Sequence, residues 1–131
     1  MKKSRYGKIG RKIYLDWSGL PDQGRRFENL MAVSLVRMAA RFTEMGWGVF
    51  EVMYIRDKEK REVDFALIKN NKPMALFETK EGDSEISPSG RYFCKRLGIP
   101  LYQIVHRFGR CEAFPDNCFK IPASKFLMLT G

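Results

Sequence analysis

The sequence predicts an α/β fold in which helices flank a central mixed β-sheet. Residues 22–45 carry apolar side chains at helical spacing, and residues 47–80 contain three strand-like stretches separated by short turns. Residues 88–105 have the pattern of a helix followed by an apolar strand. Strands joined by short turns are antiparallel, whereas a strand that returns through a helix is parallel, so the sheet is expected to be mixed.

The first elements are a short strand at residues 13–15 and a helix at residues 22–45, which Gly46 is expected to end. At about 100° per residue, one stripe of this helix holds apolar side chains: Phe27, Met31, Leu35, Met38, Phe42 and Met45. Glu28 falls on the same stripe. A core-facing carboxylate needs a metal, a cation or a hydrogen-bonding partner. Alternatively, Glu28 is a first-turn acid that the helix dipole favours and that borders the core.

Strands are expected at residues 47–55, 61–69 and 73–80, with a charged turn at residues 56–60. The last two strands form a hairpin.

In this hairpin, a three-residue loop would pair Lys69 with Pro73 and place Asp64 directly opposite Glu78, on one face. Lys80 lies two positions further along and shares that face. The register depends on the loop, because a loop of even length would move the side chains of one strand to the other face.

Two opposed carboxylates with a lysine beside them are typical of a metal-dependent phosphodiesterase. Each carboxylate makes the other harder to ionise, and a divalent cation removes that repulsion. Mg²⁺ often binds one or two carboxylates together with substrate phosphate, and a bound cation lowers the pKa of water. Lys80 would orient the water or stabilise charge that develops on the phosphate. The alternative is a solvated face of an exposed hairpin.

The rest of the chain completes the order α-β-β-β-α-β. After an acidic loop at residues 81–84, a helix is expected at 88–97, ended by Gly98, and then a strand at 99–105. Gln103 in that strand is a candidate accessory polar group, and His106 at its end is expected to be structural. Residues 106–118 are expected to be irregular. The segment 119–129 is expected to pack back through three apolar residues, Phe126, Leu127 and Leu129.

The net charge of +9 suggests a polyanionic partner such as nucleic acid. Most of it lies in residues 1–12, which hold six basic residues and no acid, so we expect a basic tail at 1–11 before a single domain at 12–131. Lys2 and Lys3 in this tail are candidate phosphate contacts, with a solvated linker as the alternative. The helix at 88–97 adds three further candidates, or an ordinary polar helix face: Arg91, Lys95 and Arg96.

Several chemistries are excluded by composition. The three cysteines form no C-x-x-C motif, so neither a zinc ribbon nor a disulfide framework is supported, and a single histidine argues against multi-histidine metal sites. The chain contains no phosphate-binding loop of the type G-x-x-x-x-G-K-[ST]. Without an apolar run of about 18 residues or a signal peptide, the protein is expected to be cytoplasmic and not bound to a membrane.

Four motifs in order resemble the PD-(D/E)xK nuclease superfamily: residues 13–16, 24–30, 62–65 and 78–80. Within it, the chain resembles the uncharacterised nuclease-like domain at the C-terminus of many prokaryotic AAA-type ATPases. The resemblance covers roughly residues 12–130. It departs from that domain at Thr79, where an aliphatic residue is more usual. Thr79 is expected to point to the opposite strand face from Glu78 and Lys80, and so to affect packing more than chemistry.

The resemblance implies a restriction-endonuclease-like αβββαβ core with a central mixed β-sheet. It implies that Asp64 and Glu78 bind Mg²⁺ or Mn²⁺, that Lys80 is the catalytic lysine and that Glu28 completes the site. The expected function is metal-dependent hydrolysis of phosphodiesters by a DNA endonuclease. The alternative is a non-catalytic nuclease-fold module that binds nucleic acid or docks a partner AAA-type ATPase. The sequence does not decide whether the substrate is DNA or RNA, or whether the protein is a monomer or a homodimer.

Overall fold

The structure is a computed structural model that describes residues 5–8, 23–82 and 85–130. The helices and strands, in chain order, are β1 (Arg5–Lys8), α1 (Gln23–Glu44), β2 (Phe50–Arg56), β3 (Glu62–Lys69), β4 (Lys72–Lys80), α2 (Pro88–Leu97), β5 (Leu101–Val105), β6 (Glu112–Phe114), β7 (Cys118–Pro122) and α3 (Ala123–Thr130). The predicted order α-β-β-β-α-β is confirmed by α1 to β5. The strand predicted at residues 13–15 lies outside the described residues.

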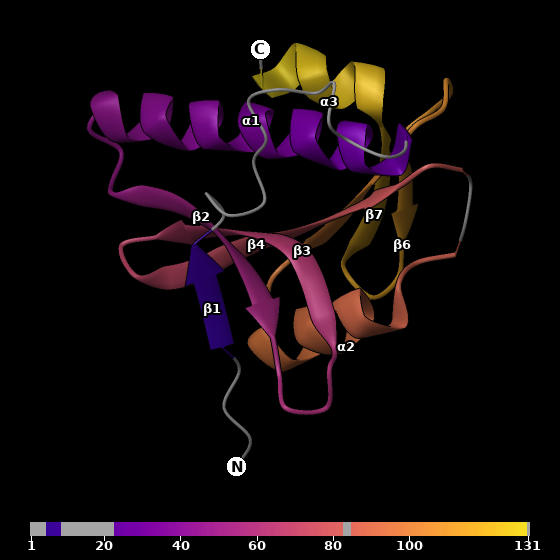
Figure 1. The fold of residues 1–131 in the computed structure, drawn as a ribbon, viewed down its shortest axis with the longest axis horizontal. Helices are drawn as coiled ribbons and strands as arrows, with labels where there is room; N and C mark the ends of the chain where they lie inside the picture. Colours follow the sequence, from indigo (N-terminus) through magenta and orange to yellow (C-terminus); the bar gives the residue numbers. More distant parts are fainter. Residues whose placement is uncertain (1–4, 9–22, 83–84, 131) are drawn as a thin grey trace.

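In the described part of the chain, the strands form one mixed sheet with the order β1-β2-β3-β4-β5-β7-β6. The first four strands pair antiparallel in succession, β5 is parallel to both β4 and β7, and β6 is antiparallel to β7. Helices α1 and α3 lie on one face of the sheet and α2 on the other (Figure 1). The α/β class with a mixed sheet between helices is therefore as predicted.

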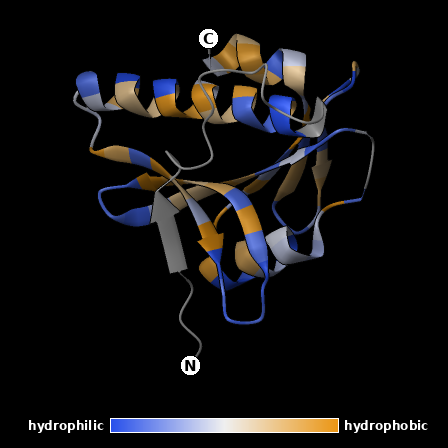
Figure 2. Cartoon of the chain, viewed as in Figure 1, coloured by the Kyte–Doolittle hydropathy of each residue, from blue (hydrophilic) through white to orange (hydrophobic). Residues whose placement is uncertain are grey.

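Helix α1 buries the middle of its predicted stripe against the sheet. Met31 and Leu35 are fully buried, and Phe27 and Ala39 almost so. Met45 is 54% exposed, so its assignment to the stripe is wrong, because the helix ends at Glu44 and the chain turns away there. Figure 2 shows the resulting contrast along α1 between orange and blue segments.

The hairpin loop is shorter than predicted. Asn70 and Asn71 form a two-residue turn with φ values of 48° and 67°, which are typical of the turn that fits the twist of a hairpin. Lys69 therefore pairs with Lys72, so the predicted pairing with Pro73 is wrong. A bulge follows, because Leu67 pairs with Ala75 while Ile68 pairs with Pro73. This extra residue restores the predicted register from the pair Leu67 and Ala75 to the pair Phe65 and Phe77.

The C-terminal part is more regular than predicted. Residues 106–118 were expected to be irregular, but they contain β6 and the first residue of β7. Helix α3 buries Phe126, whereas Leu129 is 77% exposed, so the prediction that Leu129 packs inward is wrong. The helical period places Phe126 and Thr130 on the inner side and turns Leu129 outward.

Part of the segment predicted to be a basic tail belongs to the sheet. Residues Arg5–Lys8 form β1, which pairs antiparallel with β2 from Arg5 opposite Arg56 to Lys8 opposite Met53. The other residues of that segment lie outside the described residues.

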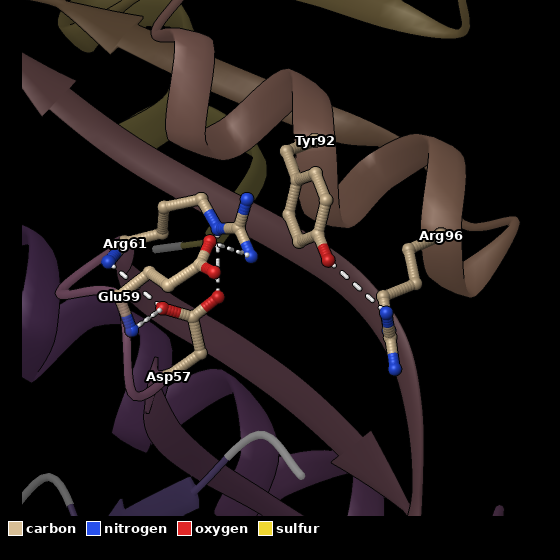
Figure 3. Close-up of polar contacts among 5 residues, drawn as sticks. All are labelled: Asp57, Glu59, Arg61, Tyr92 and Arg96. Atoms are coloured by element: carbon tan, nitrogen blue, oxygen red, sulfur yellow. Dashed lines mark hydrogen bonds and ion pairs between the residues drawn. The ribbon is translucent and has the colours of Figure 1, made fainter. Parts of the chain in front are cut away.

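A charged turn joins β2 to β3 and is built around Asp57, which is only 7% exposed (Figure 3). Asp57 Oδ1 accepts hydrogen bonds from the backbone N–H groups of Glu59 and Arg61, both at 3.0 Å, and Oδ2 accepts one from Arg61 Nε at 2.7 Å. The Arg61 guanidinium lies 3.6 Å from the ring centroid of Tyr92 on α2. The turn therefore ties the β2–β3 connection to α2.

Replacing Asp57 with alanine is expected to destabilise the fold by about 2–4 kcal/mol, because a buried charged acceptor of three hydrogen bonds is lost and the turn loses the group that orders it. Chemical denaturation followed by circular dichroism measures this change. Glu59→Ala is the matched control and should change stability by less than about 1 kcal/mol, because its side chain is 43% exposed. Equal losses in both variants would contradict the central role of Asp57.

The described residues contain two buried cysteines and one exposed cysteine, all of them reduced. The thiols of Cys94 on α2 and Cys118 on β7 both donate to the Asp116 carbonyl, at 3.4 and 3.5 Å. Burial, together with the neighbouring Cys94, raises the pKa of the Cys118 thiol to about 11. The protonated thiol is therefore favoured in the folded state.

This shift predicts a dependence of stability on pH. The folded-state pKa of Cys118 lies above the unfolded value of 9.0, so its contribution to stability is complete below pH 9 and is lost as the pH rises through 11. The free energy of unfolding of the native protein should therefore fall more steeply between these pH values than that of Cys118→Ala. Parallel curves for the two proteins would contradict the shift.

No helix in the described ranges has both the length and the apolar character needed to cross a membrane.

Candidate active site

Strands β3 and β4 separate where β3 begins and β4 ends. We call this opening, formed by residues 62–64 of β3 and 78–80 of β4, the fork. The ladder that joins β3 to β4 begins at the pair Phe65 and Phe77. Before Phe65, Glu62 and Val63 pair with β2. After Phe77, residues 78–80 of β4 pair with β5, with Glu78 beside Gln103 and Lys80 beside Val105. Strand β3 stays paired with β2 and β4 stays paired with β5 in this region, so the residues predicted to hold a metal lie where β3 and β4 stop pairing with each other.

Asp64 and Glu78 bridge this fork through side-chain hydrogen bonds. The Asp64 backbone N–H donates to Glu78 Oε1 at 3.2 Å. In return, Asp64 Oδ2 accepts from the backbone N–H of Thr79 at 3.0 Å. Each carboxylate thus reaches the backbone of the opposite strand, at the position that continues the ladder register. The predicted juxtaposition of Asp64 with Glu78 is present in the structure.

Thr79, which was expected to affect packing more than chemistry, bonds directly to Asp64. Its hydroxyl donates to Asp64 Oδ2 at 3.1 Å, beside the bond from its own backbone N–H. Two donors on one residue therefore orient the Asp64 carboxylate. Alternation along β4 places the side chain on the other strand face, as expected, but the reach of Asp64 across the fork was not visible in the sequence.

Burial differs between the two carboxylates. Glu78 is only 5% exposed, whereas Asp64, Thr79 and Lys80 are partly exposed. Solvent therefore reaches the fork from the side of Asp64 and Lys80.

Gln103 is fully buried beside Glu78 and has a definite role in positioning. Its Oε1 accepts from the Ser87 N–H and its Nε2 donates to the Glu85 carbonyl, both at 3.1 Å. Ser87 in turn caps α2 by accepting from the Gly90 N–H at 3.1 Å. Gln103 thus anchors the connection from β4 to α2, next to the fork.

Lys80 lies at the end of β4, against the first residue after β5. Its carbonyl accepts from the His106 N–H at 2.9 Å, which fixes the backbone there. Within the described residues, the Lys80 ammonium makes no hydrogen bond or ion pair. Lys80 follows Glu78 by two positions, as the predicted arrangement requires.

Glu28 belongs to α1, which begins near the carboxyl ends of β4 and β5. Phe27 stacks on His106, with ring centroids 4.8 Å apart and planes at 14°, so the first turns of α1 lie over this end of the sheet. Glu28 is partly exposed and has contacts of its own. In the described part of the chain, no three His, Cys, Asp or Glu side chains gather closely enough to hold a metal ion. The structure therefore does not bring Glu28 into one ligand group with Asp64 and Glu78.

The basic residues of α2 lie away from the fork. Ser87, at the start of α2, bonds to Gln103 near the fork, and Gly98, at its end, is close in sequence to the beginning of β5. Lys95 and Arg96 are therefore at the distant end of this helix. Arg91 forms an ion pair with Asp116 at 2.7 Å. Arg96 donates to the Tyr92 hydroxyl at 3.0 Å (Figure 3). Lys2 and Lys3 are outside the described residues.

The donor set at the fork fits a hard divalent cation. Two carboxylates are sufficient for Mg²⁺, which keeps several waters and takes substrate phosphate as a further ligand. Sulfur and imidazole, which softer metals prefer, are not supplied by Asp64, Thr79, Glu78 or Lys80.

A comparison of the chain with protein-family models, curated proteins and solved structures finds no match. The argument for function therefore depends on the geometry of the site.

Proposed function

We propose that the fork around Asp64, Glu78 and Lys80 is the active site of a metal-dependent nuclease of the PD-(D/E)xK type. The observation that carries the proposal is the pair of carboxylates that bridge the fork, with Glu78 bonded to the Asp64 N–H, Asp64 bonded to the Thr79 N–H, and Lys80 two positions beyond Glu78 on β4. Phosphodiester hydrolysis needs negative ligands for a cation and a positive group near the phosphate. The fork supplies both within a few residues.

Each residue has a distinct role in this proposal. Asp64 and Glu78 would hold Mg²⁺ or Mn²⁺, which when bound supplies Lewis acidity and lowers the pKa of water. Thr79 holds the Asp64 carboxylate in place through its two hydrogen bonds. Lys80 stabilises the negative charge that develops on the phosphate oxygens or orients the attacking water. Glu28 is not brought into this ligand group, so in this proposal it would not bind the cation.

One observation favours a second candidate, a non-catalytic module that binds nucleic acid or docks an AAA-type ATPase. Asp64 Oδ2 already accepts two hydrogen bonds from Thr79, and Glu78 Oε1 accepts one from Asp64. Carboxylates bonded in this way also serve to close a fork that lacks ladder bonds. In that case the acids are structural and require no cation.

The experiment that separates the two candidates measures cleavage by the native protein. The nuclease proposal expects Mg²⁺- or Mn²⁺-dependent cleavage of at least one substrate in a panel of linear, single-stranded and branched DNA and RNA. Isothermal titration with MnCl₂ should detect ion binding by the same preparation. If neither cleavage nor ion binding is observed while nucleic acid is bound, the module is supported and the nuclease proposal fails.

A further inference from the structure

The segment that follows β5 presents the most exposed aromatic side chain among the described residues. Phe108 is 92% exposed, whereas Trp47, at the other end of α1, is 57% exposed and packs on Phe42. We call residues 106–111 the Phe108 loop. In Figure 2 this projecting loop has an orange tip between blue segments, so an apolar side chain lies among polar ones. A single exposed aromatic side chain is common on protein surfaces, so the neighbours of Phe108 and its place in the fold must indicate any function.

The Phe108 loop is held in place at its base. The Arg107 guanidinium forms an ion pair with Glu112 on β6 at 2.6 Å and lies within 3.4 Å of the Phe108 carbonyl oxygen. Gly109 has a φ of 145°, in a region that other residues rarely adopt, and a Cβ there would collide with Arg107. The ion pair to Glu112 and the backbone of Gly109 therefore hold the loop in the conformation that turns Phe108 outward.

The Phe108 loop begins next to the proposed active site. His106 donates its backbone N–H to the Lys80 carbonyl, and Gln103 is the lateral partner of Glu78. Five residues separate Gln103 from Phe108, so an extended chain spans at most about 18 Å between them. A nucleic-acid strand that places a phosphate at the fork would therefore reach Phe108 within a few nucleotides.

The surroundings of Phe108 favour a polyanion with a flat apolar face. A hollow of about 300 Å³ beside the ring is lined by the loop and by α3: His106, Arg107, Phe108, Ser124 and Leu127. Arg110 is exposed in the loop, and Arg25 and Arg26 are exposed in the first turns of α1, which begins at the same end of the molecule (Figure 1). Arg107 is paired with Glu112, so Arg110, two positions after Phe108, is the exposed cation of the loop. An exposed ring with a basic residue near it in the chain is a combination that binds single-stranded nucleic acid, because the ring stacks on a base while the cation contacts a phosphate.

We infer that Phe108 is a base-stacking platform and that the protein binds single-stranded or locally unpaired nucleic acid through the Phe108 loop. This inference rests on the proposed function and deepens it, because it names the substrate class. A base inside a duplex is covered on both faces by its neighbours, so only an unpaired base can stack on Phe108. Arg110, Arg25 and Arg26 hold the flanking phosphates.

The test measures binding of a fluorescein-labelled 15-nucleotide oligothymidylate in EDTA, so that its outcome is independent of cleavage. Phe108→Ala should weaken binding by about 5- to 100-fold, the usual range for one lost stacking partner. Phe108→Trp should bind as well as the native protein, and Phe108→Leu should bind as poorly as Phe108→Ala. Trp47→Ala is the matched control for loss of an exposed aromatic residue and should bind normally.

A second oligomer separates stacking from charge. An abasic 15-mer keeps the phosphates but has no bases, so Phe108→Ala should bind it as the native protein does. Arg110→Ala should weaken binding to both oligomers and reduce the salt slope by about 1. A 15-nucleotide oligouridylate distinguishes RNA from DNA as the source of the strand, and a blunt 15-bp duplex should be insensitive to Phe108→Ala.

Three results would overturn the inference: native-like binding of oligothymidylate by Phe108→Ala, native-like binding by Phe108→Leu, or failure of the native protein to prefer oligothymidylate over the abasic oligomer. The first is also the result expected if the Phe108 loop instead docks a protein. If the native protein cleaves nucleic acid but Phe108→Ala binds oligothymidylate normally, only the stacking role of Phe108 is rejected. If Phe108→Ala weakens binding but the native protein cleaves no substrate, only the nuclease proposal is rejected.

Discussion

Lys80→Ala is expected to lower the rate of metal-dependent cleavage by on the order of 10²-fold or more, the usual loss when one preorganised charge aimed at a transition state is removed. Lys80 is not a proposed metal ligand, so Mn²⁺ binding and nucleic-acid binding should stay close to native values. The structure adds a reason to expect a folded variant, because Lys80 holds the fork through its backbone carbonyl, which accepts from His106. Single-turnover cleavage and titration with MnCl₂ measure the two quantities.

The matched control is Lys72→Ala, which removes an exposed lysine from the other end of β4. It should leave cleavage unchanged. If both variants lose activity equally, the effect reflects net charge. If Lys80→Ala keeps full activity, Lys80 has no catalytic role.

Asp64→Asn is expected to abolish both Mn²⁺ binding and cleavage, because it removes a charged oxygen from a cation site with few protein ligands. The fold should survive, since the amide oxygen of asparagine can accept the hydrogen bonds that Thr79 now donates to Asp64 Oδ2. Titration with MnCl₂, thermal denaturation and the cleavage assay together distinguish loss of the ion from loss of structure.

Thr79→Val provides a graded comparison. It removes the hydroxyl bond to Asp64 and keeps the backbone N–H, so ion affinity should fall by about 10- to 100-fold, as is usual when a group that orients a metal ligand is removed. If Asp64→Asn unfolds and Thr79→Val binds Mn²⁺ as tightly as the native protein does, Asp64 has a structural role and is not a metal ligand.

The regular elements could be predicted from the sequence because their signals are local. The bounds predicted for the helix at residues 88–97 agree with those of α2, since Pro88 at its start and Gly98 at its end are strong boundary residues. The long helix at residues 22–45 agrees with α1 within one residue at each end. Glu78 and Lys80 share a face because side chains alternate along any strand. These features depend only on neighbouring residues.

The predicted register of β3 against β4 agrees with the structure from Leu67 to Phe65, next to Asp64, although its basis was wrong. The sequence indicated a loop of three residues, whereas the turn has two and a bulge supplies the extra residue. A bulge depends on how a strand packs and twists against its neighbours, so local patterns do not reveal it. The alignment near Asp64 and Glu78 therefore agrees with the prediction because two differences cancel: the turn is one residue shorter than predicted, and the bulge adds one residue.

Other features were decided by tertiary structure alone. Strand β6 has three residues and exists because β7 offers an edge with which it can pair. Thr79 bonds to Asp64 because β3 and β4 do not pair with each other beyond Phe65 and Phe77, so the Asp64 side chain bridges the two strands. The outward position of Phe108 depends on the ion pair between Arg107 and Glu112 and on the backbone of Gly109.

The sequence by itself determined the order of elements, the mixed sheet and the alternation that puts Glu78 and Lys80 on one face, because each follows from residue types a few positions apart. The tertiary structure decided that the acids meet at a fork, that Thr79 orients Asp64, and that the Phe108 loop projects beside them. These features depend on strand pairing and on ion pairs between residues from different elements. Such interactions contribute to stability only after the chain has packed, so local sequence patterns do not reveal them.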